Sequence, residues 1–291
     1  MGGGKEKTHP TEYFIAGGLA GVLSRTCIAP IERVKILYQV GRGSNMSGTA
    51  VASGILRDEG VLAFWKGNSA AVVRVMPYMS LTFLTYEEYK AKLLSTGTVP
   101  KQAATMAAGS VAGVTAVVLT YPLDLVRATM ATPAGAHHTS MFSALMSISR
   151  ERGIGALYSG VTATCIGVAP YAGLKFLSYE ALKGVIGTFT GLEEQDLRPD
   201  QRLGAGLVAG MVAQTFVYPL DVVRRRMQTS ATQLYSSTWD ALSTIARQEG
   251  VRHGLYRGLT LNYLKTMPNV AIYMTVYDIC KQWLRERQLL S

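Results

Sequence analysis

The chain has 291 residues, of which 48% are hydrophobic and only 16% are charged, and its net charge is +10. Its 30 glycines and 10 prolines favour closely packed, bent helices of the kind found in membrane proteins. The mean hydropathy of +0.17 is too low for helices that face lipid on every side, so we expect an internal polar cavity. The positive charge indicates an anionic partner, and the sequence has neither a basic tail nor a nucleic-acid-binding motif, which argues against nucleic acid.

One short motif occurs three times at nearly equal spacing. It is a proline, an acidic residue two positions later and a basic residue three positions after that, at residues 30–35, 122–127 and 219–224. Each proline lies nine residues beyond the second glycine of a Gly-x-x-x-Gly pair. The copies are 92 and 97 residues apart, close to one third of the chain, which predicts a threefold repeat.

The motif has a physical interpretation as a bent helix that carries an ion pair. A proline inside a helix removes a backbone hydrogen bond and clashes with the preceding turn, so the helix bends. An acid and a base three residues apart share one helix face, and unpaired charges are costly to bury. If three such helices converge, the acid of each can pair with the base of the next. We therefore expect a ring of ion pairs that closes one end of a central opening.

The elements follow the same order in each repeat. The first repeat predicts a long helix over residues 12–40, a surface helix over residues 47–58 and a second long helix over residues 70–93. The later repeats predict surface helices over residues 141–152 and 238–249, each between two long helices. The pattern predicts an all-α membrane protein, a threefold pseudo-symmetric bundle of six transmembrane helices with three short surface helices.

The boundaries of the three repeats follow from these elements: 12–95, 102–186 and 200–287. Residues 102–123 form a charge-free run that is long enough to cross a bilayer. A charge-free stretch such as residues 14–24 is too short to cross a bilayer alone, which fits helices whose charges face a cavity.

The sequence gives little sign of catalytic or metal chemistry. It contains neither a phosphate-binding Gly-x-x-x-x-Gly-Lys motif nor a His-Glu-x-x-His motif, so we expect no enzyme activity and no catalytic residues. Cys27, Cys165 and Cys280 lie singly in apolar segments and are interpreted as packing residues. His137 and His138 are neighbours in a loop, where solvation is the simpler interpretation, so we expect no metal site.

Three further motifs consist of an aromatic residue, an acid directly after it and a base three residues after the acid, at residues 86–90, 179–183 and 277–281. With these, the proline motifs and the glycine pairs, the chain resembles the mitochondrial carrier family over essentially its whole length. The resemblance implies six tilted transmembrane helices, surface helices on the matrix side and both termini on the cytosolic side of the mitochondrial inner membrane. It also implies alternating access to a central site. We expect a monomer with no cofactor and with cardiolipin as a structural lipid.

The resemblance assigns two rings of ion pairs that close alternately. The matrix ring consists of three pairs: Glu32 with Arg127, Asp124 with Arg224 and Asp221 with Lys35. The cytosolic ring consists of three others: Glu87 with Lys183, Glu180 with Lys281 and Asp278 with Lys90. Gln39 and Gln228 resemble glutamines that brace the matrix pairs, whereas Ala131 stands at the equivalent position of the second repeat. The second repeat also departs from the family at Arg152, where an acid is usual, and at Ser159, where a base is usual.

Substrate contacts are expected near mid-membrane, between the two rings. Arg74, Gly167 and Lys265 are equivalent positions of the three repeats, each three residues before a proline. Arg25 adds a third cation, and Tyr78, Tyr171 and Lys175 are also expected to face inward. Gly167 and Val168 resemble the glycine-aliphatic pair of adenine-nucleotide carriers, in which the absent side chain leaves a flat slot for a planar base.

Residues 68–78, 170–174 and 218–229 look most like the coenzyme A transporter branch of the family. We therefore expect exchange of coenzyme A and adenosine 3′,5′-bisphosphate for adenine nucleotides. An ADP/ATP carrier and an ATP-Mg/phosphate carrier stay open as alternatives, although Gln228 and Thr229 interrupt the ADP/ATP signature and the short N-terminal segment leaves no room for EF-hands. A non-transporting membrane scaffold is the alternative of another class, and it would have no need for cations in a cavity.

Overall fold

The structure is a computed structural model that describes residues 10–41, 47–95, 100–135, 138, 140–191, 196–230 and 235–289. Its six long helices are α1 (Pro10–Val40), α3 (Asn68–Ser95), α4 (Lys101–Met130), α6 (Val161–Thr190), α7 (Pro199–Thr229) and α9 (Leu259–Leu289). Its short helices are α2 (Gly48–Glu59), α5 (Met141–Arg152) and α8 (Thr238–Glu249). Single-turn segments complete the connections, at Val61–Trp65, Pro133–Gly135, Ile154–Tyr158 and Val251–Leu255.

The predicted all-α architecture is confirmed. α5 and α8 have the predicted bounds, and α2 begins one residue later than predicted. The difference has a local cause, because the hydroxyl of Ser47 accepts a hydrogen bond from the amide of Ala50 and so caps the helix from outside. Gly60, with φ 79°, follows the last residue of α2 and gives the chain the turn that it needs to leave the helix.

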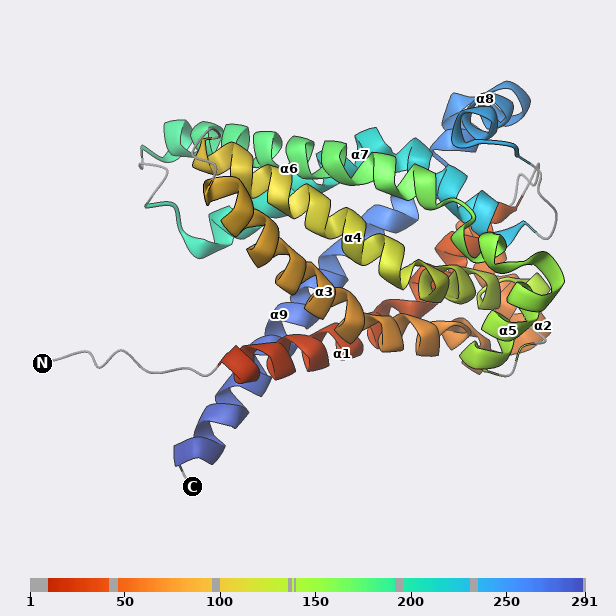
Figure 1. The fold of residues 1–291 in the computed structure, drawn as a ribbon, viewed down its shortest axis with the longest axis horizontal. Coiled ribbons are helices and arrows are strands. Elements are labelled where there is room, and N and C mark those ends of the chain that lie inside the picture. The colour runs from red at the N-terminus through yellow and green to blue at the C-terminus, as the bar shows by residue number, and fades with distance from the viewer. Residues whose placement is uncertain are drawn as a thin grey trace, which may run out of the picture.

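Figure 1 shows the long helices as a bundle, with α2, α5 and α8 gathered at one end and the start of α1 and the end of α9 at the other. The long helices have 28 to 31 residues, or about 42–47 Å at 1.5 Å per residue. That length exceeds a hydrocarbon core of about 30 Å, so the helices must tilt or bend. Each holds an internal proline: Pro30, Pro77, Pro122, Pro170, Pro219 and Pro268.

Three described helical segments are apolar enough over 18 residues to qualify as membrane spans by composition: Lys101–Met130, Ile154–Thr190 and Pro199–Thr229. The first contains the charge-free run at residues 102–123 that the sequence singled out. α1, α3 and α9 are of similar length, but charges such as Arg25 and Lys265 interrupt their apolar stretches. These two side chains line an internal cavity, so they do not need to face lipid.

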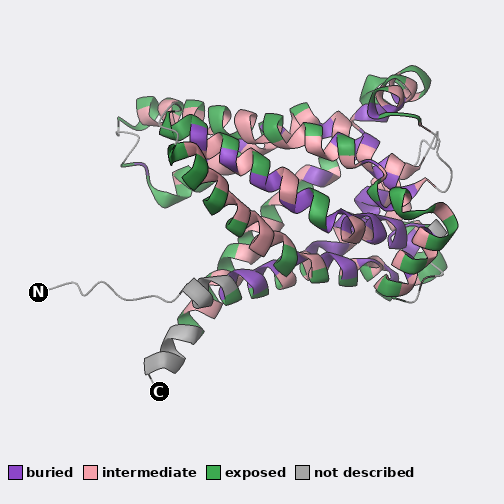
Figure 2. Ribbon diagram, viewed as in Figure 1, coloured by how far each residue is buried: buried purple, intermediate pink, exposed green. Residues whose placement is uncertain are grey.

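Burial is greatest at the end of the bundle that carries the short helices, as Figure 2 shows. Each short helix places one buried isoleucine, Ile55, Ile148 or Ile245, in a separate apolar cluster with the long helix that precedes it. The clusters are therefore repeated three times, like the sequence motifs. They fix the ends of α1, α4 and α7, the helices that carry the charged proline motifs.

Two glycines allow the second long helix of a repeat, α3 or α6, to approach these motifs. Gly67, just before α3, has φ 83°, and a Cβ there would lie 2.7 Å from the carbonyl oxygen of Arg127. Gly160, just before α6, has φ 82°, and its Cβ would lie 3.1 Å from the carbonyl oxygen of Arg224. Both the backbone conformation and the lack of space therefore require glycine.

Gly67→Ala is expected to destabilise the protein, because alanine would adopt a left-handed conformation and meet a backbone oxygen. Such strain costs about 1–3 kcal/mol before any clash is counted. Gly54→Ala in α2 is the matched control, since its Cβ meets no atom within 4 Å and alanine favours helix by up to about 1 kcal/mol. Thermal unfolding in detergent should show a lower midpoint for the first variant and an equal or higher midpoint for the second. Equal midpoints for Gly67→Ala and the parent would contradict this account of Gly67.

Candidate substrate-binding site

The proline motifs of α1, α4 and α7 converge, and their charged side chains form the three contacts of the matrix ring. The contacts are Lys35 Nζ to Asp221 Oδ2 at 2.8 Å, Arg127 Nη2 to Glu32 Oε1 at 3.5 Å, and a hydrogen bond from Arg224 to Asp124 Oδ2. The acidic side chains are 17%, 7% and 1% exposed. Each pair joins two different repeats, so the ring ties the three repeats together.

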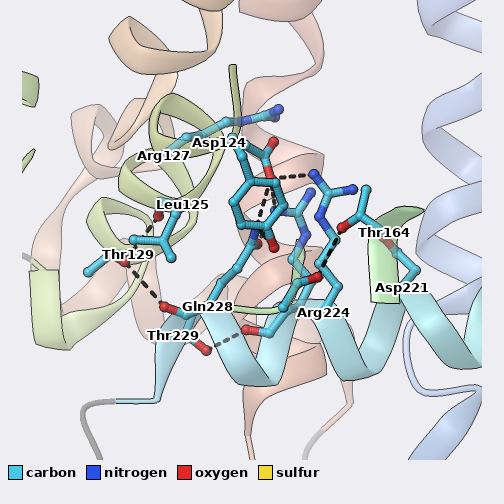
Figure 3. Close-up of polar contacts among 12 residues, drawn as sticks. Asp124, Leu125, Arg127, Thr129, Thr164, Asp221, Arg224, Gln228 and Thr229 are labelled. Carbon is cyan, nitrogen blue, oxygen red and sulfur yellow. Dashed lines mark hydrogen bonds and ion pairs between the residues drawn. The ribbon is translucent and has the colours of Figure 1, made fainter. Parts of the chain in front are cut away.

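The expected glutamine braces are in place in two of the three pairs. The side-chain amide of Gln228 donates to Asp124 at 2.8 Å and to the Tyr121 hydroxyl at 3.0 Å, and Figure 3 shows this network around Asp124. Gln39 donates to Asp221 at 3.2 Å and to the Tyr218 hydroxyl at 3.0 Å. Ala131 has no side-chain amide to offer the remaining pair, Glu32 with Arg127, whose contact is the longest of the three.

Arg74 and Lys265, which the sequence assigned to substrate, are also bonded to acids of the matrix ring. Arg74 donates to Asp124 Oδ1 at 3.0 Å and to the Thr120 hydroxyl at 3.1 Å. Lys265 donates to Glu32 Oε2. Asp124 and Glu32 thus use one oxygen for a ring partner and the other for a cation of the expected substrate site. This link between the site and the ring was not predicted from the sequence.

Arg225 and Asn262 are two further members of the ring that sequence reasoning missed. Arg225 is nearly buried, donates to Gln228 at 3.0 Å and lies 3.6 Å from an oxygen of Asp124. Asn262 accepts a hydrogen bond from Lys35 at 2.9 Å. The only sequence signal for Arg225 was its place in a run of three arginines, because neither of the other repeats has a base at the equivalent position.

A cavity of about 610 Å³ lies on the inner side of this ring, and all five residues expected to contact substrate line it: Arg25, Arg74, Gly167, Val168 and Lys265. Its lining includes six basic residues (Arg25, Arg74, Arg127, Arg224, Arg225 and Lys265) and three acidic ones (Glu32, Asp124 and Asp221). The lining therefore carries an excess of three positive charges, which suits an anion with several charges.

The neutral residues of the lining determine where the cavity has open space. A Cβ on Gly167 would make only an ordinary contact with Leu220, at 3.7 Å, so the glycine leaves open space. Val168 packs against the apolar cluster of α4, and its side chain would lie 3.2 Å from a Cβ on Gly113. The Arg74 guanidinium lies 4.9 Å from the centre of the Tyr78 ring. Gly167 thus leaves open space in a cavity that Arg74 also lines.

For the cytosolic ring the sequence predicted pairs between helices, which should form only when the matrix ring opens. The contacts that the structure gives for these charges lie within single helices. Lys183 instead bonds Glu180 of its own helix at 2.8 Å, and Lys90 lies 5.2 Å from the ring centre of Tyr86. The physical reason is separation, since the ends of α6 and α9 lie far apart in Figure 1.

The described residues contain no group of three or more His, Cys, Asp or Glu that could bind a metal ion. His137 lies outside the described residues. The three cysteines are free, and Cys165 packs against the apolar cluster of α4.

Comparison with known proteins identifies the family. The family model described as mitochondrial carrier protein matches residues 6–97, 99–189 and 195–288. The chain belongs to the mitochondrial carrier family. It is 42% identical over 283 residues to the human mitochondrial coenzyme A transporter SLC25A42, covering 94% of this chain and 88% of that protein. It is 40% identical over 296 residues to the maize mitochondrial carrier protein CoAc2, covering 94% and 86%.

Family membership makes this protein a multi-pass solute carrier of the mitochondrial inner membrane. The short helices of the carrier lie at the end of the bundle where the ion-pair ring is closed. The family resemblance places this end on the matrix side. At the opposite end of the bundle, the ends of α6 and α9 lie far apart in Figure 1. The structure therefore represents a conformation that is closed toward the matrix.

Two repeats of the carrier have an additional ion pair that joins a long helix to a short one. Arg33 lies 2.9 Å from Glu59, the last residue of α2, and Arg226 forms two hydrogen bonds with Glu249, the last residue of α8. Partial burial opposes ionisation of Glu59, but hydrogen bonds from Lys66 and Arg33 hold its pKa below the usual value. The second repeat has Arg152 at the equivalent position, so α5 depends on its apolar contacts instead.

Proposed function

We propose that this carrier exchanges coenzyme A and adenosine 3′,5′-bisphosphate for adenine nucleotides by alternating access, and that it catalyses no chemical reaction. The observation that supports the substrate class is the cavity with six basic and three acidic residues. Coenzyme A combines a 3′-phosphate with a 5′-diphosphate and carries about four negative charges at neutral pH, because a phosphate monoester holds up to about two. The excess of cations therefore matches a nucleotide better than a dicarboxylate or a neutral solute.

The arrangement of the cavity supports the same substrate. The open space at Gly167 offers a slot for the adenine ring, with Arg74, Arg25 and Lys265 available to the phosphates. Relatives that are about 40% identical are named coenzyme A transporters in human, rat and mouse. A scaffold without transport would have no use for buried cations at this depth, because each one is costly to keep in a membrane.

The contacts of Arg74 and Lys265 suggest how substrate opens the matrix ring. A phosphate that binds Arg74 competes with Asp124 for the guanidinium, and a phosphate that binds Lys265 competes with Glu32 for the ammonium. Substrate thereby removes one partner from each of two ring acids. A ligand shifts a two-state equilibrium only through such differential contacts, so the ring should weaken chiefly when substrate is bound. The empty carrier keeps its matrix ring intact and so cannot open toward the matrix. Transport should therefore be an obligatory exchange of one substrate for another.

The purified carrier in liposomes is expected to import labelled coenzyme A against internal ADP or adenosine 3′,5′-bisphosphate, with little import into empty liposomes. Robust ADP/ATP exchange without coenzyme A uptake or competition would reject the coenzyme A assignment and favour the ADP/ATP alternative. Uptake of ATP-Mg in exchange for phosphate would favour the ATP-Mg/phosphate carrier alternative. Absence of all flux from folded protein would favour the scaffold.

We also propose cardiolipin as a structural lipid on the matrix side. Support comes from two surface cavities, each at a place where a short helix of one repeat begins beside a long helix of another. One is lined by Arg152, Gly160 and Ser237, and the other by Gly48, Arg252 and Gly258. Helix N-termini present unpaired amide groups and favour phosphate.

A further inference from the structure

A second cavity of about 440 Å³ lies between α6, α7 and α9. Tyr171, Gln214 and Asn269 line both this cavity and the central one, so the two cavities adjoin at these side chains. We call the second cavity the side chamber. It follows α7 from Leu203 to Gln214, a rise of about 16 Å at 1.5 Å per residue, and is thus elongated toward the cytosolic end.

The side chamber differs from the central cavity in its chemistry. Its wall is mainly apolar and neutral polar, with side chains such as Leu207, Met211, Thr266, Val270 and Met274. Only two basic residues reach it, Lys175 and Arg202, and its described lining holds no acidic residue. A chamber of this kind suits a long, uncharged group that carries a few hydrogen-bonding atoms.

From this geometry we propose that the side chamber binds the pantetheine arm of coenzyme A while the central cavity binds its nucleotide part. The proposal rests on the proposed transport of coenzyme A. The arm is a flexible, uncharged chain with a dimethyl group, two amides and a terminal thiol. Its apolar groups match the wall, and its amides need hydrogen-bonding partners wherever the chain is removed from water.

The junction of the two cavities offers such partners. The side-chain amides of Gln214 and Asn269 form no hydrogen bond with any other residue that the structure describes, so both are available to a ligand. The chamber wall itself is held in place, because the hydroxyls of Thr215 on α7 and Tyr263 on α9 are hydrogen-bonded to each other. ADP and adenosine 3′,5′-bisphosphate have no arm and would leave the chamber unused, so its side chains should affect coenzyme A alone.

The first test fills the chamber from either side with Met211→Trp on α7 or Val270→Trp on α9. Uptake of coenzyme A should fall by about tenfold or more, equivalent to about 1.4 kcal/mol, while uptake of adenosine 3′,5′-bisphosphate changes by less than about twofold. Val208→Trp is the matched control, since Val208 is 47% exposed on α7 and does not line the chamber. It should leave both activities unchanged. Equal loss of both substrates in the filled variants, or no loss of either, would overturn the proposal.

A second test avoids added bulk. Val270→Cys should react with a small maleimide. Coenzyme A with its thiol methylated, so that it cannot consume the reagent, should protect the new thiol, whereas adenosine 3′,5′-bisphosphate should not, with the parent protein as the background for the native cysteines. Equal protection by the two substrates, or none by coenzyme A, would overturn the assignment of the arm. Failure of the parent protein to transport coenzyme A at all is a separate result and would reject the proposed function itself.

Discussion

Exchanging the charges of Lys35 and Asp221 is expected to restore part of the transport that either single reversal removes. The two side chains lie 2.8 Å apart in the matrix ring, and Lys35 is only 3% exposed. Reversal of one partner leaves like charges together in a buried site, and loss of a buried pair costs about 3–5 kcal/mol. Each single variant should therefore lose closure toward the matrix, and transport should fall by at least about tenfold. The double reversal rebuilds an opposite-charge pair at the same place.

Asp124 and Arg224 provide the matched comparison, and there the double reversal should fail. Arg224 and Arg74 bond the two oxygens of Asp124, and Arg225 lies 3.6 Å away. An arginine at position 124 would face Arg74 and Arg225 even when position 224 is acidic. Counter-exchange of labelled nucleotide in liposomes, normalised to the amount of folded protein, measures both pairs. No recovery for Lys35 with Asp221, or equal recovery for both pairs, would contradict the ring as described.

The different outcomes expected for the Lys35–Asp221 and Asp124–Arg224 pairs show what the threefold sequence repeat predicts and what it does not. The threefold register of the proline motifs was enough to predict the six long helices and the three contacts of the matrix ring, because equivalent positions must meet around a common axis. On that basis alone, Asp124 and Arg224 look like an isolated pair. Arg225 breaks the register, since the other repeats have no base there, and a comparison of repeats cannot reveal it.

The second contacts of Arg74 and Lys265 were missed for a related reason. The sequence placed both residues at the substrate level because they precede their prolines by three residues. It did not show that each is long enough to reach an acid of the ring. Their replacement by alanine therefore tests two functions together, and a loss of transport from such a variant would not identify a phosphate contact.

The cytosolic ring marks a different limit of sequence reasoning. The motifs predict both rings, but a carrier that alternates cannot close both at once, and the two states must be close in free energy. Which state is occupied depends on small differences summed over many contacts. The pairing of Lys183 with Glu180, three residues earlier on α6, is an example, because the cytosolic ring expected from the motifs pairs Lys183 with Glu87 instead.

Gly167→Trp is expected to abolish nucleotide transport, because an indole at this position would occupy the proposed adenine slot. Uptake of both coenzyme A and ADP should fall by at least about a hundredfold, equivalent to roughly 2.7 kcal/mol, since both substrates carry the same base. The fold should tolerate the change. A Cβ at this position meets only Leu220, at 3.7 Å, and the larger ring has the cavity to enter. We therefore expect the thermal unfolding midpoint in detergent to change by less than about 3 °C, or about 1 kcal/mol for a chain of this size.

Gly167→Ala and Gly173→Trp separate the slot from simple packing. Alanine adds one methyl group at ordinary contact distance, so Gly167→Ala should keep most of the transport activity. Gly173 lies on the same helix and also has space for a side chain, but it lines neither the central cavity nor the side chamber. Tryptophan there should leave transport intact. If Gly167 serves only to pack α6 against α7, then Gly167→Trp should lower the unfolding midpoint, and substrate should no longer raise it. A stable Gly167→Trp protein that still transports both nucleotides would show that the base binds elsewhere in the cavity.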